Sequence, residues 1–180
     1  MRRRVPRARC AAPLLALLLA GASSLTPLRA GVMMEGFYWN CPGPWYPTMQ
    51  SNASSLASMI GGYGINRIWF PVPDKAASGG LSMGYDPYDY YDVGSYSQSN
   101  GPGTHFGTQA QLKSAIAAYK ALGVSCIADV VLNHRSGGQS ESNGYTGGTS
   151  YTNFSAVQSG MCKWHWDSFH PNSNEVSDEG

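Results

Sequence analysis

Polar side chains end an apolar run near the middle of the chain, in the segment Asp129-Val130-Val131-Leu132-Asn133-His134. If this run is a buried parallel strand, the polar groups emerge at its carboxyl end, where α/β folds build active sites. The amide oxygen of Asn133 suits a hard cation such as Ca²⁺, and the imidazole of His134 can donate a hydrogen bond to a sugar hydroxyl. A plainer interpretation also fits these residue types, in which Asp129 and Asn133 satisfy loop backbone groups and His134 is an ordinary half-exposed histidine.

The elements that would position this segment begin with an apolar, aromatic stretch at residues 32–39, which predicts a first strand bounded by a Pro- and Gly-rich turn. A short helix is predicted next, from apolar residues at helical spacing and a closing glycine cluster; these residues are Leu56, Met59, Ile60 and Tyr63. Residues 65–72 are a second apolar run and predict a second strand. Pro71 and Pro73 mark where its regular pairing stops.

A loop rich in Gly, Ser, Asp and Tyr follows for about 30 residues, and loops of that length are usually functional. Thr108 and Gln111 then have the spacing of a capping box, and Gly123 supplies a helix stop. The apolar face of this helix consists of Leu112, Ala115, Ile116, Tyr119 and Leu122. Residues 124–132 are almost continuously apolar, as in a parallel strand covered on both faces. The order predicts an α/β fold with a right-handed parallel sheet, either doubly wound or closed into a barrel.

The composition argues against polyanionic partners. Charged residues make up 13% of the 180 residues, the net charge is +1, and no stripe of Lys and Arg is present to bind a nucleic acid. Tyr and Trp are plentiful instead, and their flat apolar faces suit the C–H faces of sugar rings, although they also serve as ordinary core residues.

Residues 1–30 have the pattern of a secretory signal peptide, with five arginines before a short apolar run at residues 14–20 and small residues after it. We therefore expect a secreted, extracellular protein without a membrane span, cleaved after Ser24 or after Ala30. Cys10 would leave with the signal peptide. Cys126 lies in an apolar run and is expected to be a reduced core residue, which leaves Cys41 and Cys162 as a pairing that the sequence allows.

Several segments resemble, in the right order, the signature regions of the α-amylase superfamily, glycoside hydrolase family 13. Residues 129–134 are similar to its first signature region, and residues 84–94, which begin Gly-Tyr-Asp-Pro-Tyr-Asp, are similar to its loop after the second strand. The segments 36–39, 68–71 and 106–108 also match. The resemblance implies strands one to three of a partial TIM (β/α)₈ barrel at residues 31–135, followed by the incomplete start of an irregular inserted domain at residues 136–180.

The resemblance also implies a role for individual residues. Tyr85 would stack on the sugar ring on the non-reducing side of the cleaved bond, unless it merely packs within a turn, and His134 would hydrogen-bond the same sugar. Asn133 would coordinate Ca²⁺ between barrel and inserted domain, Asp129 would support the site from beneath, and Trp39 is a weaker candidate for the substrate cleft. The remaining calcium ligands are not selected by spacing; candidates are Asp167, Asp178 and Glu179. Glu35 stands where the family more often has glutamine.

The implied activity is endo-acting, retaining hydrolysis of α-1,4-glucosidic bonds in starch, glycogen and malto-oligosaccharides, by a full-length enzyme expected to be a monomer. Retaining hydrolysis needs two carboxyl groups ~5 Å apart. The family carries its catalytic carboxylates after the inserted domain, so we assign no catalytic residue within this chain and expect the chain alone to be inactive. The alternatives are a truncated, non-catalytic glucan-binding or vestigial protein and a related enzyme that acts on α-1,6 bonds or transfers glycosyl groups.

Overall fold

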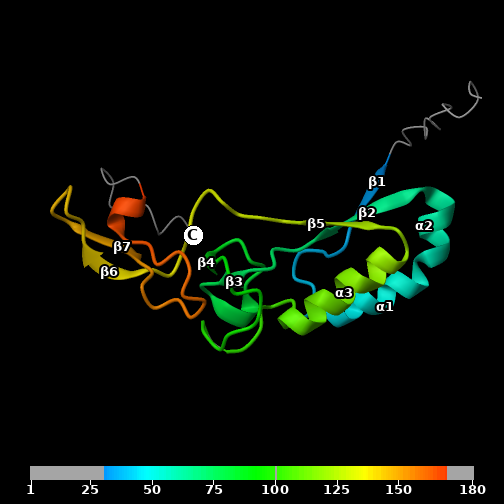
Figure 1. Cartoon of the computed structure of the whole chain (residues 1–180), viewed down its shortest axis with the longest axis horizontal. Helices are drawn as coiled ribbons and strands as arrows, with labels where there is room; N and C mark the ends of the chain where they lie inside the picture. The colour runs from blue at the N-terminus through cyan, green and yellow to red at the C-terminus, as the bar shows by residue number, and fades with distance from the viewer. Residues whose placement is uncertain (1–30, 100, 170–180) are drawn as a thin grey trace, which may run out of the picture. The chain divides into compact units, whose positions relative to one another are not determined.

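A three-stranded parallel sheet is the framework of the computed structural model, which describes residues 31–99 and 101–169. The sheet has the order β1-β2-β5, with β1 at Val32–Glu35, β2 at Ile65–Phe70 and β5 at Ser125–Ala128 (Figure 1). Its register pairs Glu35 with Trp69 and Trp69 with Ile127. The predicted α/β class and parallel sheet are confirmed, while the three strands form an open sheet and not a closed barrel.

Three helices connect the strands. The chain passes from β1 through α1 (Tyr46–Ser55) and α2 (Ala57–Tyr63) to β2, and through α3 (Gln109–Ala121) to β5. The capping box of α3 is present, since the Thr108 side chain accepts a hydrogen bond from the Gln111 amide and the Gln111 side chain accepts one from the Thr108 amide. The predicted short helix corresponds to α2. Helix α1 was not predicted, because its ten residues carry few apolar side chains.

The core lies where α1 and α3 run side by side along one face of the sheet (Figure 1). Tyr46 and Met49 of α1 and Ala115 of α3 are fully buried there, against Ile68 and Phe70 of β2. The face of α3 was predicted correctly except at its end, because Leu122 remains exposed. The remaining members of the core are Phe37, Cys41, Ala53, Met83, Phe106, Leu112, Tyr119 and Val124.

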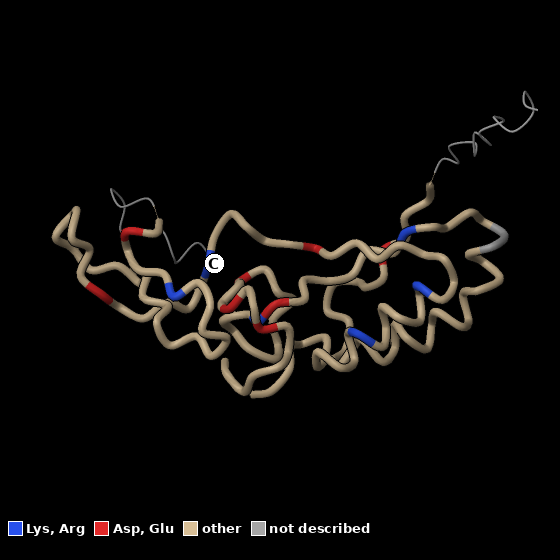
Figure 2. Tube along the Cα trace, viewed as in Figure 1, with Lys and Arg blue, Asp and Glu red and all other residues tan. Residues whose placement is uncertain are grey.

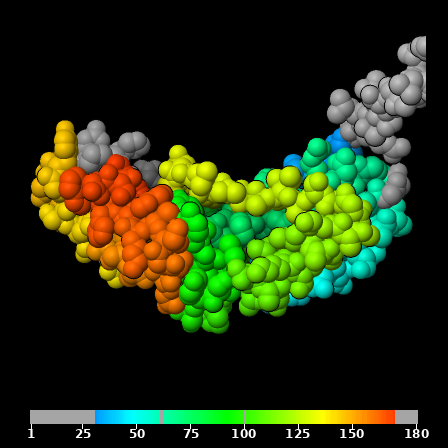
Figure 3. Space-filling view, in the orientation of Figure 1, coloured from blue at the N-terminus to red at the C-terminus, as the bar shows by residue number. Residues whose placement is uncertain are grey.

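Both outer strands are shorter than predicted. The last hydrogen bond between β1 and β2 runs from the Gly36 amide to the Trp69 carbonyl, at 2.9 Å. The last one between β5 and β2 runs from the Asp129 amide to the Phe70 carbonyl, at 3.1 Å. The prediction that residues 124–132 are covered on both faces is wrong: Ile127, Val130 and Leu132 are exposed. Figure 3 shows the segment after β5 running along the surface in this view.

The long loop after β2 is held by buried charges. It contains β3 (Lys75–Ala76), η1 (Gly79–Leu81) and β4 (Pro87–Asp89), with β3 antiparallel to β4. Lys75 and Asp92 are both buried, with Nζ and Oδ2 3.8 Å apart, and the amide of buried Gln98 donates to both Asp89 and Asp92 at 2.8 Å. Figure 2 shows acidic positions gathered in this loop region. The loop is therefore ordered by these side-chain bonds in addition to the short β3–β4 pairing.

Residues after 135 are more regular than predicted. They form a hairpin of β6 (Gln139–Ser142) and β7 (Thr149–Asn153), followed by η2 (Trp166–Ser168). Glu141 joins the two parts, because its carboxylate accepts hydrogen bonds from Thr152 at 2.5 Å and from the Trp166 amide at 2.7 Å.

Cys41, Cys126 and Cys162 are free thiols in the part of the chain that the structure describes, so the Cys41–Cys162 pairing does not form. Burial raises the pKa of the Cys126 thiol, in keeping with a reduced cysteine at the edge of the core. Within the described ranges, every helix is too short or too polar to span a bilayer. The predicted signal peptide lies outside the described residues.

Candidate functional site

The five site residues predicted from the sequence lie together, in a group that we call the Tyr85 cluster: Trp39, Tyr85, Asp129, Asn133 and His134. The ring of Trp39 stacks on that of Tyr85, with centroids 5.8 Å apart and planes inclined by 23°. The Tyr85 hydroxyl donates a hydrogen bond of 2.6 Å to Oδ2 of Asp129, and Nε2 of His134 lies 2.8 Å from the Tyr85 carbonyl oxygen. Three segments distant in the sequence thus meet at one tyrosine.

The strand ends and two tight turns place these residues. Asp129, Asn133 and His134 follow directly from β5, and Trp39 follows β1 in a turn where Asn40 has a φ of 61°. Tyr85 follows Gly84, whose φ is 93° and whose position would bring a Cβ within 2.5 Å of Cβ of Val72. A larger residue at position 84 would push this turn away from the end of β2, and with it the ring of Tyr85.

Two groups in the cluster act as hydrogen-bond donors toward their neighbours, His134 through Nε2 and Tyr85 through its hydroxyl. Since a carbonyl oxygen can only accept, Nε2 of His134 carries the proton that is donated to Tyr85. In a neutral imidazole Nδ1 is then the acceptor, and Nδ2 of Asn133 donates a long hydrogen bond of 3.5 Å to it. Desolvation, followed by the hydrogen bond to Asp129 and the charges of Asp129 and Glu35, raises the pKa of Tyr85 to about 12. The phenol therefore stays protonated and remains a donor at neutral pH.

The exposed surface of the cluster is aromatic. Trp39 is 65% exposed and Tyr85 38% exposed, so their rings form a two-ring platform that is open to solvent. Asp129 is the carboxylate of this cluster, and one of its oxygens is bound by Tyr85. The negative charge of Glu35, for which the sequence offered no function, acts on the same tyrosine and reinforces its protonated state.

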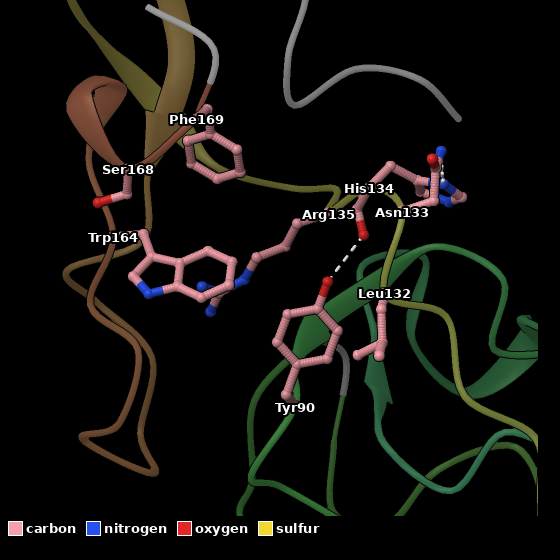
Figure 4. A pocket seen from close by; sticks show the side chains of 8 residues that line it. All are labelled: Tyr90, Leu132, Asn133, His134, Arg135, Trp164, Ser168 and Phe169. Atoms are coloured by element: carbon pink, nitrogen blue, oxygen red, sulfur yellow. Dashed lines mark hydrogen bonds between the residues drawn. The ribbon is translucent and has the colours of Figure 1, made fainter.

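A cavity of about 310 Å³ adjoins the cluster, between the segment after β5 and the chain around η2 (Figure 4). Leu132, Asn133 and His134 contribute to one wall, and Trp164 and Phe169 to another. Tyr90 anchors the first wall, because its hydroxyl donates a hydrogen bond of 2.8 Å to the His134 carbonyl, as Figure 4 shows.

Arg135 is the residue of this region that the sequence did not reveal. Its fully buried side chain donates to the Tyr88 carbonyl from Nε and Nη2, at 3.0 and 2.8 Å, and to the Cys162 carbonyl from Nη1 at 2.7 Å. The guanidinium carbon also lies 3.9 Å from the ring centroid of Phe154 and 5.0 Å from that of Trp164. Arg135 thus joins the loop of β4 to the residues after the hairpin. In the sequence, Arg135 is only a basic residue directly after the polar strand end. Its burial cannot be predicted without knowing the aromatic residues that surround it.

The described residues do not by themselves make a calcium site. The Asn133 amide could offer Oδ1, but the cavity beside it is lined by a buried arginine and contains no carboxylate. Nowhere in the described ranges do three or more His, Cys, Asp or Glu side chains group as metal ligands. Of the other candidate ligands, Asp167 lies in η2, whereas Asp178 and Glu179 lie outside the described residues. Calcium binding by Asn133 therefore stays a prediction.

No protein-family model matches the chain. Among curated proteins, it is 37% identical over 112 residues to the cytoplasmic alpha-amylase of Escherichia coli K12, covering 61% of this chain and 22% of that protein. It is also 37% identical over 109 residues to an alpha-amylase of Geobacillus stearothermophilus, covering 59% of this chain and 19% of the relative. The chain thus spans about a fifth of the length of these relatives.

Two solved structures show weaker similarity. Truncated alternansucrase from Leuconostoc mesenteroides is 24% identical with a TM-score of 0.43, covering 55% of this chain and 10% of that one. Alpha-amylase I from Eisenia fetida is 19% identical with a TM-score of 0.37, covering 66% of this chain and 21% of that one. TM-scores at this level do not establish a shared fold. The sequence identities carry the relationship: over about 60% of its length, the chain is homologous to glycoside hydrolases of the α-amylase family.

Proposed function

We propose that the Tyr85 cluster binds a glucosyl unit of an α-1,4-linked glucan, and that the protein serves endo-acting, retaining hydrolysis of starch- and glycogen-type glucans. The observation that supports this most directly is the exposed Trp39–Tyr85 platform with hydrogen-bonding groups beside it. An aromatic face suits the apolar C–H face of a pyranose ring, and the groups at its edge can orient the hydroxyls. The homology to α-amylase family enzymes points to the same class of substrate.

The proton positions refine what each residue would do. Because Nε2 of His134 is engaged by the Tyr85 carbonyl, Nδ1 is the atom that would accept a hydrogen bond from a sugar hydroxyl, in place of Asn133. Asp129 would hold the Tyr85 ring through its bond to the hydroxyl, which makes it a positioning residue. One face of the Tyr85 ring is covered by Trp39, so the sugar would stack on the opposite face or on the exposed part of Trp39.

The groups that would bind a glucan do not include a pair of carboxyl groups that could hydrolyse it. Retaining cleavage requires a nucleophilic carboxylate and an acid ~5 Å apart, whereas the carboxylate of the Tyr85 cluster is already bound by a phenol. Asp89 and Asp92 lie close together through Gln98, but both are fully buried and serve the loop. We expect the 180-residue chain to bind glucans without cleaving them. A glucan-binding protein without hydrolase activity is therefore the second candidate. Export of the protein, from the pattern at residues 1–30, is part of the same proposal.

The test is calorimetric titration of the 180-residue chain with maltoheptaose, with the β-linked cellohexaose as a stereochemical control. Tyr85→Ala should weaken maltoheptaose binding roughly fivefold, since an aromatic contact contributes about 1 kcal/mol. Tyr145→Ala removes a tyrosine that is 70% exposed on the hairpin and should leave binding unchanged. Equal affinity of the wild-type chain for the two sugars, or of the Tyr85 variant and the wild type for maltoheptaose, would contradict the proposal.

The same preparations incubated with soluble starch should release no new reducing ends. Turnover that co-purifies with the chain and disappears in Asp129→Asn would show that Asp129 has a catalytic role, contrary to the positioning role assigned here.

A further inference from the structure

A tight turn before α3 places His105 between two other segments of the chain. Thr104 and Gly107 exchange backbone hydrogen bonds of 2.8 and 3.1 Å, so His105 and Phe106 lie at the tip of this turn. Phe106 is fully buried and belongs to the core. The backbone of His105 is therefore anchored, and its half-buried ring extends from a fixed point.

The imidazole of His105 bridges the carbonyl groups of the two segments. Nε2 lies 2.7 Å from the carbonyl oxygen of Cys41, and Nδ1 lies 3.0 Å from that of Gly80. Carbonyl oxygens only accept hydrogen bonds, and a neutral imidazole has a single N–H. Both bonds therefore form together only when the ring is doubly protonated. Histidine is the side chain that changes charge between about pH 5 and pH 8.

The Cys41 carbonyl belongs to the turn that carries Trp39. The Cys41 amide donates to the Tyr38 carbonyl at 3.0 Å, which closes a turn with Trp39 and Asn40 at its centre. Since the ring of Trp39 is largely exposed, its position depends on the backbone of this turn. The bond from His105 holds the turn at its end.

The Gly80 carbonyl belongs to the segment that carries Tyr85. Gly80 lies in η1. The Ser82 hydroxyl, directly after η1, donates to Asp86 and accepts from the Gly84 amide at 3.0 Å, so it contacts both neighbours of Tyr85 in the sequence. The imidazole thus links the two segments whose rings stack in the Tyr85 cluster.

Few charged groups lie on the elements around His105. Neither ion pair in the described ranges includes it. Asp86 is the acid on the η1 side, and Lys75 binds a backbone carbonyl two residues before His105. Burial raises the pKa of the Cys41 thiol and of the Tyr46 phenol, so both stay neutral. The two carbonyl dipoles are therefore the direct partners of a proton on His105.

We propose that His105 is a positioning residue which, as an imidazolium, orders the Trp39–Tyr85 platform for glucan binding. The inference rests on the proposed function and deepens it, because it makes the affinity of the platform depend on one proton. When the ring is neutral, one of the two carbonyls faces a nitrogen lone pair, and its segment is released. The two stacked rings then lose one of their shared supports.

The experiment measures the Kd for maltoheptaose in the wild-type 180-residue chain and in His105→Gln, at about pH 5.5 and about pH 8. The glutamine side chain is neutral throughout and donates from a single nitrogen. We expect the variant to bind about threefold more weakly than the wild type at the lower pH, and equally well at the higher pH. The effect is smaller than that of Tyr85→Ala, because the platform is loosened and not removed.

Two controls isolate His105. Protonation of His134 changes the affinity of both proteins alike, so it does not alter the ratio of their Kd values. His165→Gln replaces a histidine whose Nδ1 is bound to Glu141 of the hairpin, and it should leave the ratio to the wild type at one at both pH values.

NMR tests the same inference without a sugar and without a variant. The nitrogen shifts of the His105 ring should show two protonated nitrogens at about pH 5.5. Nuclear Overhauser effects between the rings of Trp39 and Tyr85 should weaken as the pH rises to about 8. A purely structural role for His105 would lower the melting temperature of His105→Gln without making these ring contacts depend on pH. The wild-type spectra decide the matter if the glutamine variant does not fold.

Three results would overturn the positioning role. The first is a Kd ratio that is the same at both pH values while Tyr85→Ala still weakens binding, which would leave the proposed function intact. The second is a His105 ring with one protonated nitrogen at the lower pH, and the third is a set of Trp39–Tyr85 ring contacts that does not change with pH. A wild-type chain that binds no maltoheptaose would instead refute the proposed function, and the ring contacts would still report whether His105 orders the platform.

Discussion

Replacing Arg135 with methionine should destabilise the region after residue 135 more than any exposed substitution would. The change keeps much of the apolar stem and removes the guanidinium, which makes three hydrogen bonds to two backbone carbonyls, those of Tyr88 and Cys162. It also removes the contact with the Phe154 ring, at 3.9 Å. The side chain is fully buried, so water cannot replace these interactions.

The magnitude follows from opposing contributions. Three hydrogen bonds from a charged donor stabilise by about 1.5–3 kcal/mol each, and a desolvated cation–π contact adds about 2 kcal/mol. Desolvation of the charge opposes them by several kcal/mol, and it is the leading cause of the lowered pKa of Arg135. The balance gives a loss of about 3 kcal/mol in the free energy of unfolding for Arg135→Met.

Urea unfolding followed by tryptophan fluorescence measures this loss, since Trp164 lies next to the guanidinium. The matched control is Arg67→Met, on the exposed side of β2, which should change the free energy of unfolding by less than about 0.5 kcal/mol. Trypsin cleavage after Lys163 reports on the same region locally and should accelerate in Arg135→Met. A midpoint and a cleavage rate equal to those of the wild type would refute the clamping role of Arg135.

Three further changes test other parts of the structure. The pKa of Asp74 is raised from 3.8 to about 6 in the folded chain, so ionisation of this carboxyl lowers the free energy of unfolding as pH rises from about 4 to about 6. The free energy of unfolding of Asp74→Asn should therefore equal that of the wild type at pH 4 and exceed it by about 2–3 kcal/mol at pH 7. A difference that stays constant across this pH range would contradict the raised pKa. Thr108→Ala should cost about 1 kcal/mol in chemical unfolding through loss of the capping box, whereas Ser114→Ala, on the exposed side of α3, should cost little; equal effects would refute the capping role. If Asn133 binds Ca²⁺, added calcium should raise the melting temperature of the wild type but not of Asn133→Ala, and identical melting curves with calcium and with chelator would remove Asn133 from any metal site.

Local chemistry in the sequence predicted a large part of this structure. The capping residues of α3, its apolar face and the order of strands and helices all follow from patterns within about fifteen residues. The place of Asp129 and His134 at a strand end also follows from the apolar run before them, whereas their meeting with Tyr85 was implied by the resemblance to the α-amylase superfamily. Trp39 was a weaker candidate from the same resemblance, and the structure stacks its ring on that of Tyr85.

Features that depend on distant partners were missed. Helix α1 has a weak apolar pattern and is stabilised by packing on α3, and so it cannot be recognised from its own residues. The apolar run at residues 124–132 suggested a long, buried strand, but pairing requires a neighbour, and β2 ends at Phe70. Arg135 and Lys75 carried no local signal, because their partners are distant in the sequence. Arg135 binds Cys162, 27 positions away, and Lys75 binds Gly101 and Gly103, 26 and 28 positions away.

The loop between β3 and α3 owes its form partly to residues outside the recognisable motif at residues 84–94. Asp92 organises its own neighbours, accepting hydrogen bonds from the amides of Gly94, Ser95 and Tyr96. Lys75, however, holds the Gly101 and Gly103 carbonyls, and Asp89 is bound by the amide and hydroxyl of Ser159. Residues 84–94 transplanted into another scaffold would therefore carry the recognisable motif without Lys75 and Ser159, two of the residues that hold its shape.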